Sequence, residues 1–206
     1  MHTKVKIPSF ISSFGLGAVA TGVAVLIYRG EPIRILDGGF RSFFTGWSFD
    51  IPNILIISLV VFLFLVFLQK KTVIGTYVDA IGGDEKLTRL NGIPVNKFKI
   101  ISFGIAGFCY GIAGVILAAR LGTGTAELST GLLLHSIAAV LLGGTALQGG
   151  NGGVTRTLVG ALIISSLKTG IIVLRINPYF QEGFIGIVLV IVLLLGAKRG
   201  QLVINK

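Results

Sequence analysis

The stretch Ile51–Gln69 reads IPNILIISLVVFLFLVFLQ and contains no Asp, Glu, Lys or Arg. A bilayer core is about 30 Å thick and a helix rises about 1.5 Å per residue, so a helix needs roughly 20 apolar residues to cross. The whole chain shares this character: of its 206 residues 53% are hydrophobic and 13% charged, and the mean hydropathy is +0.91. This composition indicates a membrane protein and excludes an ordinary soluble domain.

Other stretches of the chain are also apolar enough to enter the bilayer. Two lack charged residues and two carry one charge each, and in chain order these four are Ser9–Tyr28, Ile100–Ala119, Thr157–Leu174 and Tyr179–Ala197. A further stretch, Gly131–Leu147, is shorter and is interrupted by Gly143 and Gly144, so it either crosses or forms a half-helix or re-entrant segment. We predict an all-α integral membrane protein with about six transmembrane helices or half-helices. We expect residues 1–206 to form a single transmembrane domain with a cytoplasmic loop over residues 70–99.

The distribution of positive charge predicts the orientation of these crossings. With six crossings, the N-terminus, the 70–99 loop, the turn at Arg156 and the C-terminal tail share one side and carry 12 Lys and Arg, against 5 on the other side. Short cytoplasmic segments are enriched in Lys and Arg. We therefore expect a multi-pass protein of the cytoplasmic (inner) membrane with both termini in the cytoplasm. This topology accounts for the net charge of +10, and we expect no nucleic-acid partner.

Several kinds of chemistry are disfavoured by the residues that the chain contains. One cysteine, Cys109, excludes an intrachain disulfide framework, and two histidines disfavour a metal site. The stretch Gly143–Gly153 reads GGTALQGGNGG and lacks the Lys and Ser/Thr of a phosphate-binding loop, so we interpret it as a tight cytoplasmic turn. We expect no catalytic residues, no metal and no cofactor bound by this chain.

Two polar residues and one row of glycines lie within the predicted membrane segments. His135 and Ser136 lack a hydrolase motif, so His135 is interpreted either as buried and hydrogen-bonded or, with Ser136, as lining a pathway. Small residues three and four positions apart share one helix face and let helices approach closely. This face serves either as a packing seam or as a sliding surface during transport, and its glycines are Gly104, Gly107, Gly111 and Gly114.

The loop over residues 70–99 contains the sequence signals of a short helix. Asp84 and Glu85 suit the first turn, Gly92 and Pro94 suit the end, and Leu87 and Leu90 share a face. A helix of two turns is marginal in water, so something must hold it. It either packs against its own membrane domain or docks into a groove of a cytoplasmic partner.

Three blocks of sequence resemble one transporter family. These are GGDEKLTRLNGIPVNKFKI (82–100), FGIAGFCYGIAGVILAARL (103–121) and IAAVLLGGTALQGGNGG (137–153), within a likeness that runs from about Ile7 to the C-terminus. The chain resembles the permease subunit of ribose-type ABC sugar importers, apparently without the first spans of that family. The resemblance implies a coupling helix that contacts a separate ATP-binding subunit, formed by Gly82, Gly83, Asp84, Glu85, Lys86, Leu87, Arg89, Leu90 and Gly92.

The resemblance also implies partners and a function. Two permease copies, identical or different, form the pathway, and an extracytoplasmic solute-binding protein delivers a monosaccharide or a related small polar solute. The chain departs from the family just before IAAV, where Leu134, His135 and Ser136 replace the usual acidic residues. The alternative is a truncated or structural membrane subunit without independent transport activity. A channel that works without ATP would fit the spans but would leave the short cytoplasmic helix unexplained.

Overall fold

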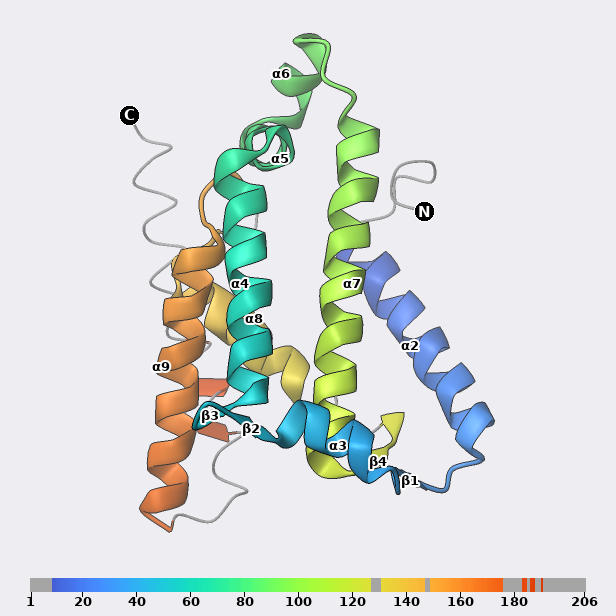
Figure 1. The fold of residues 1–206 in the computed structure, drawn as a ribbon. Coiled ribbons are helices and arrows are strands. Elements are labelled where there is room, and N and C mark those ends of the chain that lie inside the picture. The colour runs from blue at the N-terminus through green and yellow to red at the C-terminus, as the bar shows by residue number, and fades with distance from the viewer. Residues whose placement is uncertain are drawn as a thin grey trace. The chain divides into compact units, whose positions relative to one another are not determined.

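The computed structural model describes residues 9–126, 131–146, 149–175, 183–184, 186–187 and 190, and Figure 1 shows the arrangement of the helices along the chain. The chain divides into two compact units, which are described one at a time. The first comprises Met1–Val61 and Lys99–Thr130, and the second comprises Phe62–Phe98 and Gly131–Lys206. Two long helices, α4 (Asn53–Lys71) and α7 (Val95–Leu121), each contribute residues to both units.

Three of the described helices are long and apolar enough to cross a membrane. They are α4, α7 and α9 (Val154–Val173), and they correspond to three of the predicted spans. The α2 helix has the bounds of the first predicted span, Ser9–Tyr28. The predicted span Tyr179–Ala197 lies almost wholly outside the described residues. The all-α membrane architecture expected from the sequence is therefore confirmed.

The first unit contains a short amphipathic helix and two small antiparallel ladders next to its long helices. The helix is α3 (Gly38–Thr45), and it leads into a hairpin of β2 (Trp47–Ser48) and β3 (Ile51–Pro52). The second ladder pairs β1 (Ile33–Arg34) with β4 (Thr123–Gly124). This ladder joins the segment after α2 to the segment after α7, so the C-terminal ends of these two helices are linked.

The second unit is organised around the contact between two helices, α8 (Leu132–Leu142) and α9. A small core forms where Ala138 and Ala139 meet Ile164. A Cβ atom at Gly160 would overlap the carbonyl oxygen of Ala139, so the two backbones touch with no side chain between them. The α8 helix has 11 residues and spans only about 16 Å, roughly half of a bilayer core. In the described part of Gly131–Leu147 the helix is therefore too short to cross a bilayer by itself.

The segment between α4 and α7 contains two helices where the sequence predicted one. The first is α5 (Val73–Gly83), and the second is α6 (Glu85–Leu90), separated by Asp84 alone. Figure 1 shows both helices in the connection from α4 to α7. Tyr77 of α5 also makes an edge-to-face contact with Phe98 of α7, with ring centroids 4.8 Å apart. The segment is thus a folded structure attached to the ends of the two long helices.

Candidate functional site

The α6 helix is fixed at its beginning by Asp84. The Asp84 side chain accepts a hydrogen bond of 3.0 Å from the backbone N–H of Leu87, which caps a free donor of the first turn. The helix ends at Asn91, and Gly92 follows with a φ of 79°, a left-handed conformation that glycine adopts without steric cost. Both ends therefore form where the sequence predicted them.

The inner face of α6 is attached to α5 through Thr88. This side chain is 6% exposed, and its hydroxyl lies 2.9 Å from the carbonyl oxygen of Ala80 and 2.7 Å from that of Asp84. The hydroxyl has one proton to donate, and these two carbonyl oxygens share it. The contact with α5 explains how a helix of six residues, too short to be stable alone, keeps its shape.

The outer face of α6 is apolar and open. Leu87 is 58% exposed and Leu90 is 82% exposed, whereas Thr88 lies about 160° around the helix from Leu90. Glu85 and Arg89 form an ion pair of 3.1 Å beside this face. The chain thus holds α6 by one side and leaves two leucines unburied on the other, which is the pattern of a helix that docks against another protein.

The end of α5 is in backbone contact with the turn between α8 and α9. Gly82 approaches Gly150 so closely that a Cβ atom on Gly82 would overlap the Gly150 nitrogen. A Cβ atom on Gly150, where φ is 74°, would lie 2.8 Å from the Gly83 Cα. We call this contact between Gly82–Gly83 and Gly149–Gly150 the glycine clasp. It joins the residues just before α6 to the half-helix α8 and to α9.

A second contact ties the same turn to α4. The backbone N–H of Val154, the first residue of α9, donates a hydrogen bond of 2.8 Å to Oε1 of Gln69. This bond connects residues 85 positions apart in the sequence. The described residues Gly149–Gly153 therefore lie at the same end of the second unit as α5.

The structure corrects one detail of the predicted coupling segment. Gly82 and Gly83, which the resemblance assigns to the coupling helix, form the last turn of α5 instead. Glycine is a poor helix former, so helix propensity alone does not place these two residues inside a helix. The close contact of Gly82 with the α8–α9 turn explains why that position requires a residue without a side chain. Sequence reasoning also missed Thr88 and Gln69, whose roles depend on contacts with distant segments.

The predicted seam on α7 is an open strip of backbone within its own unit. Gly104, Gly107, Gly111 and Gly114 are all exposed. A Cβ atom built at any of them would meet no atom within 4 Å among the described residues of the first unit. Its use as a packing seam or a sliding surface stays a prediction.

His135 and Ser136 both bond back to carbonyl groups one turn earlier in α8. The His135 Nδ1 atom donates to the Gly131 oxygen over 2.6 Å, and the Ser136 hydroxyl donates to the Leu132 oxygen over 2.7 Å. The other ring nitrogen of His135, Nε2, is buried and has no hydrogen-bond partner among the described residues. The histidine therefore satisfies one of its two polar atoms and leaves the second available inside the protein.

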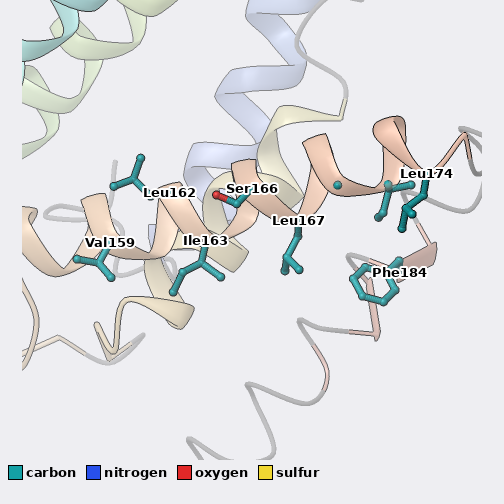
Figure 2. Close-up of a pocket in the computed structure, with 9 residues that line it drawn as sticks. Val159, Leu162, Ile163, Ser166, Leu167, Leu174 and Phe184 are labelled. Carbon is teal, nitrogen blue, oxygen red and sulfur yellow. The ribbon is translucent and has the colours of Figure 1, made fainter.

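A groove of about 650 Å³ runs along α9, and Phe184 also lines it. Figure 2 shows its wall, with Leu167 and Leu174 facing Phe184 and with Val159 and Ile163 farther along the helix. Ser166 is the one hydroxyl-bearing residue among those that line it. Such a lining suits an acyl chain or another helix better than a solute rich in hydroxyl groups.

The long apolar helices and the helix pair between α4 and α7 together define an all-α membrane protein. Residues 1–193 match the family described as branched-chain amino acid transport system / permease component, and the chain belongs to this family.

Individual relatives carry more specific names. The chain is 36% identical over 199 residues to the ribose import permease protein RbsC of Bacillus subtilis (strain 168), covering 96% of this chain and 62% of that relative. It is 33% identical over 187 residues to the L-arabinose transport system permease protein AraH of Escherichia coli (strain K12), covering 90% and 57%. It is 35% identical over 189 residues to the probable ABC transporter permease protein YphD of the same strain, covering 92% of this chain and 57% of that relative. The chain thus spans about three fifths of the length of these curated relatives. No solved structure matches it.

Proposed function

We propose that this chain is the membrane-spanning subunit of an ATP-binding-cassette importer for a monosaccharide or a related small polar solute. Relatives named as ribose and arabinose permeases support the solute class. The observation that carries the coupling role is the geometry of α6, which is bound to its own chain through Thr88 while Leu87 and Leu90 remain exposed. In this proposal those leucines enter a groove of a separate ATP-binding subunit.

The described contacts supply a route by which movement of α6 reaches the membrane segment. A push on the exposed face passes through Thr88 to α5, because the hydroxyl of Thr88 bonds to the Ala80 carbonyl. It passes next through the glycine clasp to the α8–α9 turn, where backbone touches backbone with no flexible side chain between. Since α8 and α9 are packed together through Gly160, the two helices then move as one body. Two alternative positions of this body would give the two states that alternating access requires.

The half-helix at the end of this route carries the candidate pathway residues. His135 and Ser136 belong to α8, and the free Nε2 of His135 is a polar atom that a solute hydroxyl could meet. A half-helix inside the bilayer is compatible with a polar path beside it, because broken helices are tolerated where they line such paths. In the proposed complex a second permease copy completes the pathway and an extracytoplasmic solute-binding protein delivers the solute. In this proposal the importer lies in the cytoplasmic membrane, and both termini of the chain face the cytoplasm.

Co-purification with the ATP-binding subunit, followed by reconstitution, tests this function. The assay compares solute-dependent ATP hydrolysis and uptake of a panel of pentoses and hexoses by the wild type and by the double variant Leu87→Asp with Leu90→Asp. Buried carboxylates would oppose docking in an apolar groove, so we expect the variant to lose most of both activities. The control is Leu36→Asp, which adds the same group at a residue that is 90% exposed in the first unit. If the double variant keeps the solute-dependent ATP hydrolysis and the uptake of the wild type, the docking role is refuted.

The alternative is a truncated or structural membrane subunit that assembles without transporting. The observation in its favour is that the chain spans only about three fifths of the length of its curated relatives. It predicts co-purification with the other subunits but no uptake of any sugar in the panel by the wild type. Uptake of one sugar by the wild-type complex would exclude it.

A further inference from the structure

The α3 helix separates aromatic from polar side chains around its axis. Phe40, Phe43 and Phe44 fall within an arc of about 100°, while Arg41 and the small polar residues lie on the opposite side. The Asp37 side chain caps the helix by accepting hydrogen bonds from the N–H groups of Gly39 and Phe40, at 2.8 and 3.4 Å. The rings of Phe43 and Phe44 pack edge to face with centroids 5.1 Å apart. The helix thus presents one continuous aromatic face.

The hairpin that follows α3 extends this face with two more aromatic residues. Trp47 pairs with Pro52, and the two-residue turn at Phe49 and Asp50 has φ values of 53° and 60°. Positive φ at both positions is the geometry of a tight hairpin turn, which glycine and asparagine adopt most readily. The turn leaves Phe49 97% exposed and Trp47 72% exposed. Exposing a large aromatic side chain to water at such a tip is unfavourable, which suggests that the tip faces something other than water.

Asn53 fixes α3 and the hairpin to the first turn of the long helix α4. Its side-chain amide donates a hydrogen bond of 2.8 Å to the carbonyl oxygen of Phe43, and its backbone N–H donates one of 2.9 Å to that of Gly46. Figure 1 shows α3 and the hairpin at the N-terminal end of α4. Because α4 is apolar from its first turn onward, a bilayer crossed by α4 would place these aromatic side chains near the level where that helix enters it.

We infer that Phe40, Phe43, Trp47 and Phe49 form an aromatic anchor that inserts into the lipid interface at the N-terminal end of α4. Aromatic side chains concentrate at this level of the bilayer, and an amphipathic helix there buries its apolar face about 5–10 Å into the headgroup boundary. Arg34 and Arg41, both exposed, lie in the same unit and are suited to pair with lipid phosphates. The fixed link to α4 selects lipid as the occupant, since the bilayer reaches this face without any further partner.

The single tryptophan of the chain makes this inference testable without any substitution. The protein is reconstituted into vesicles of phosphatidylcholine and phosphatidylglycerol whose acyl chains carry bromine either near the headgroup or deep in the tail. We expect both lipids to quench Trp47 fluorescence, the shallow bromine more strongly, and aqueous iodide to quench it weakly. Quenching by iodide to the extent seen for free indole, with none by brominated lipid, would overturn the inference.

A soluble protein partner on the same face would give a different result. Brominated lipid would then leave Trp47 unaffected, and a purified solute-binding protein would block its quenching by iodide. That result overturns the lipid anchor. The variant Phe49→Ser tests the anchor further, because the tip side chain touches no core, and it should lower quenching by lipid and raise quenching by iodide. The control Leu90→Ser makes a similar change at a comparably exposed site on α6 and should alter neither.

Discussion

The glycine clasp predicts that one methyl group at Gly82 loosens the turn between α8 and α9. In the variant Gly82→Ala the new Cβ would overlap the backbone nitrogen of Gly150 and lie 3.2 Å from the Gly149 carbonyl carbon. Both neighbours are backbone, so neither can rotate away. Overpacking of this kind costs about 1–3 kcal/mol. A change of about 1–3 kcal/mol corresponds to roughly a 5- to 150-fold change in an equilibrium constant, which here describes opening of the clasp.

Hydrogen exchange measured by mass spectrometry follows this opening directly. The backbone N–H of Val154 is the reporter, because it is protected by its hydrogen bond to Gln69 at the edge of the same turn. In Gly82→Ala we expect its exchange to accelerate roughly 5- to 150-fold, in proportion to the open population.

The neighbouring variant Gly83→Ala is the matched control. A Cβ atom there meets no atom within 4 Å, and alanine favours helix over glycine by about 0.8–1.0 kcal/mol. Exchange at Val154 should therefore stay unchanged or slow down. Equal exchange in the two variants would show that the glycine clasp does not hold the turn, and would remove the proposed route from α6 to α8.

Three smaller changes should have graded effects. Thr88→Val keeps the shape but removes a buried donor, so local unfolding of α6 should become easier by about 1–3 kcal/mol, as measured by hydrogen exchange of its backbone. Gly160→Ala should destabilise the α8–α9 pair by about 1–3 kcal/mol in denaturant unfolding in detergent, because its methyl group meets the Ala139 carbonyl. Gly170→Ala, where the methyl meets open space, should not destabilise it, and equal losses in both would argue against this packing. Glu85→Gln breaks an exposed ion pair, so its effect on stability should stay below about 0.5 kcal/mol, and a larger loss would contradict this assessment.

The sequence predicted best those elements whose formation depends on local chemistry. The α4 helix follows from a run of apolar residues long enough to cross a bilayer, and α6 follows from Asp84 at its start and Gly92 after its end. The interruption at Gly143 and Gly144 likewise predicts a helix end near these residues, and α8 ends at Leu142. In each case the signal lies within a few residues of the feature.

Elements that depend on distant contacts were missed. The α5 helix ends in Gly82 and Gly83, two residues that helix propensity disfavours, and the approach of Gly150 explains the first of them. No single sequence reveals that pairing, since the two segments are far apart in the chain. The α3 helix was missed because it is short and its aromatic face has meaning only beside α4. The roles of the α7 seam and of His135 stay predictions, because they concern partners and a pathway.

Site-specific cross-linking at Leu90 tests the coupling role of α6 most directly. Cys109, the one native cysteine, is replaced by serine, and Leu90→Cys then carries a photoactivatable group in the assembled complex with its ATP-binding subunit. Because Leu90 is 82% exposed on the outer face of α6, the product should join the permease to that subunit. The control Leu36→Cys, at a residue that is 90% exposed in the first unit, should give no product with that subunit. If the group at Leu90 also reacts only within its own chain, the proposed docking of α6 is wrong.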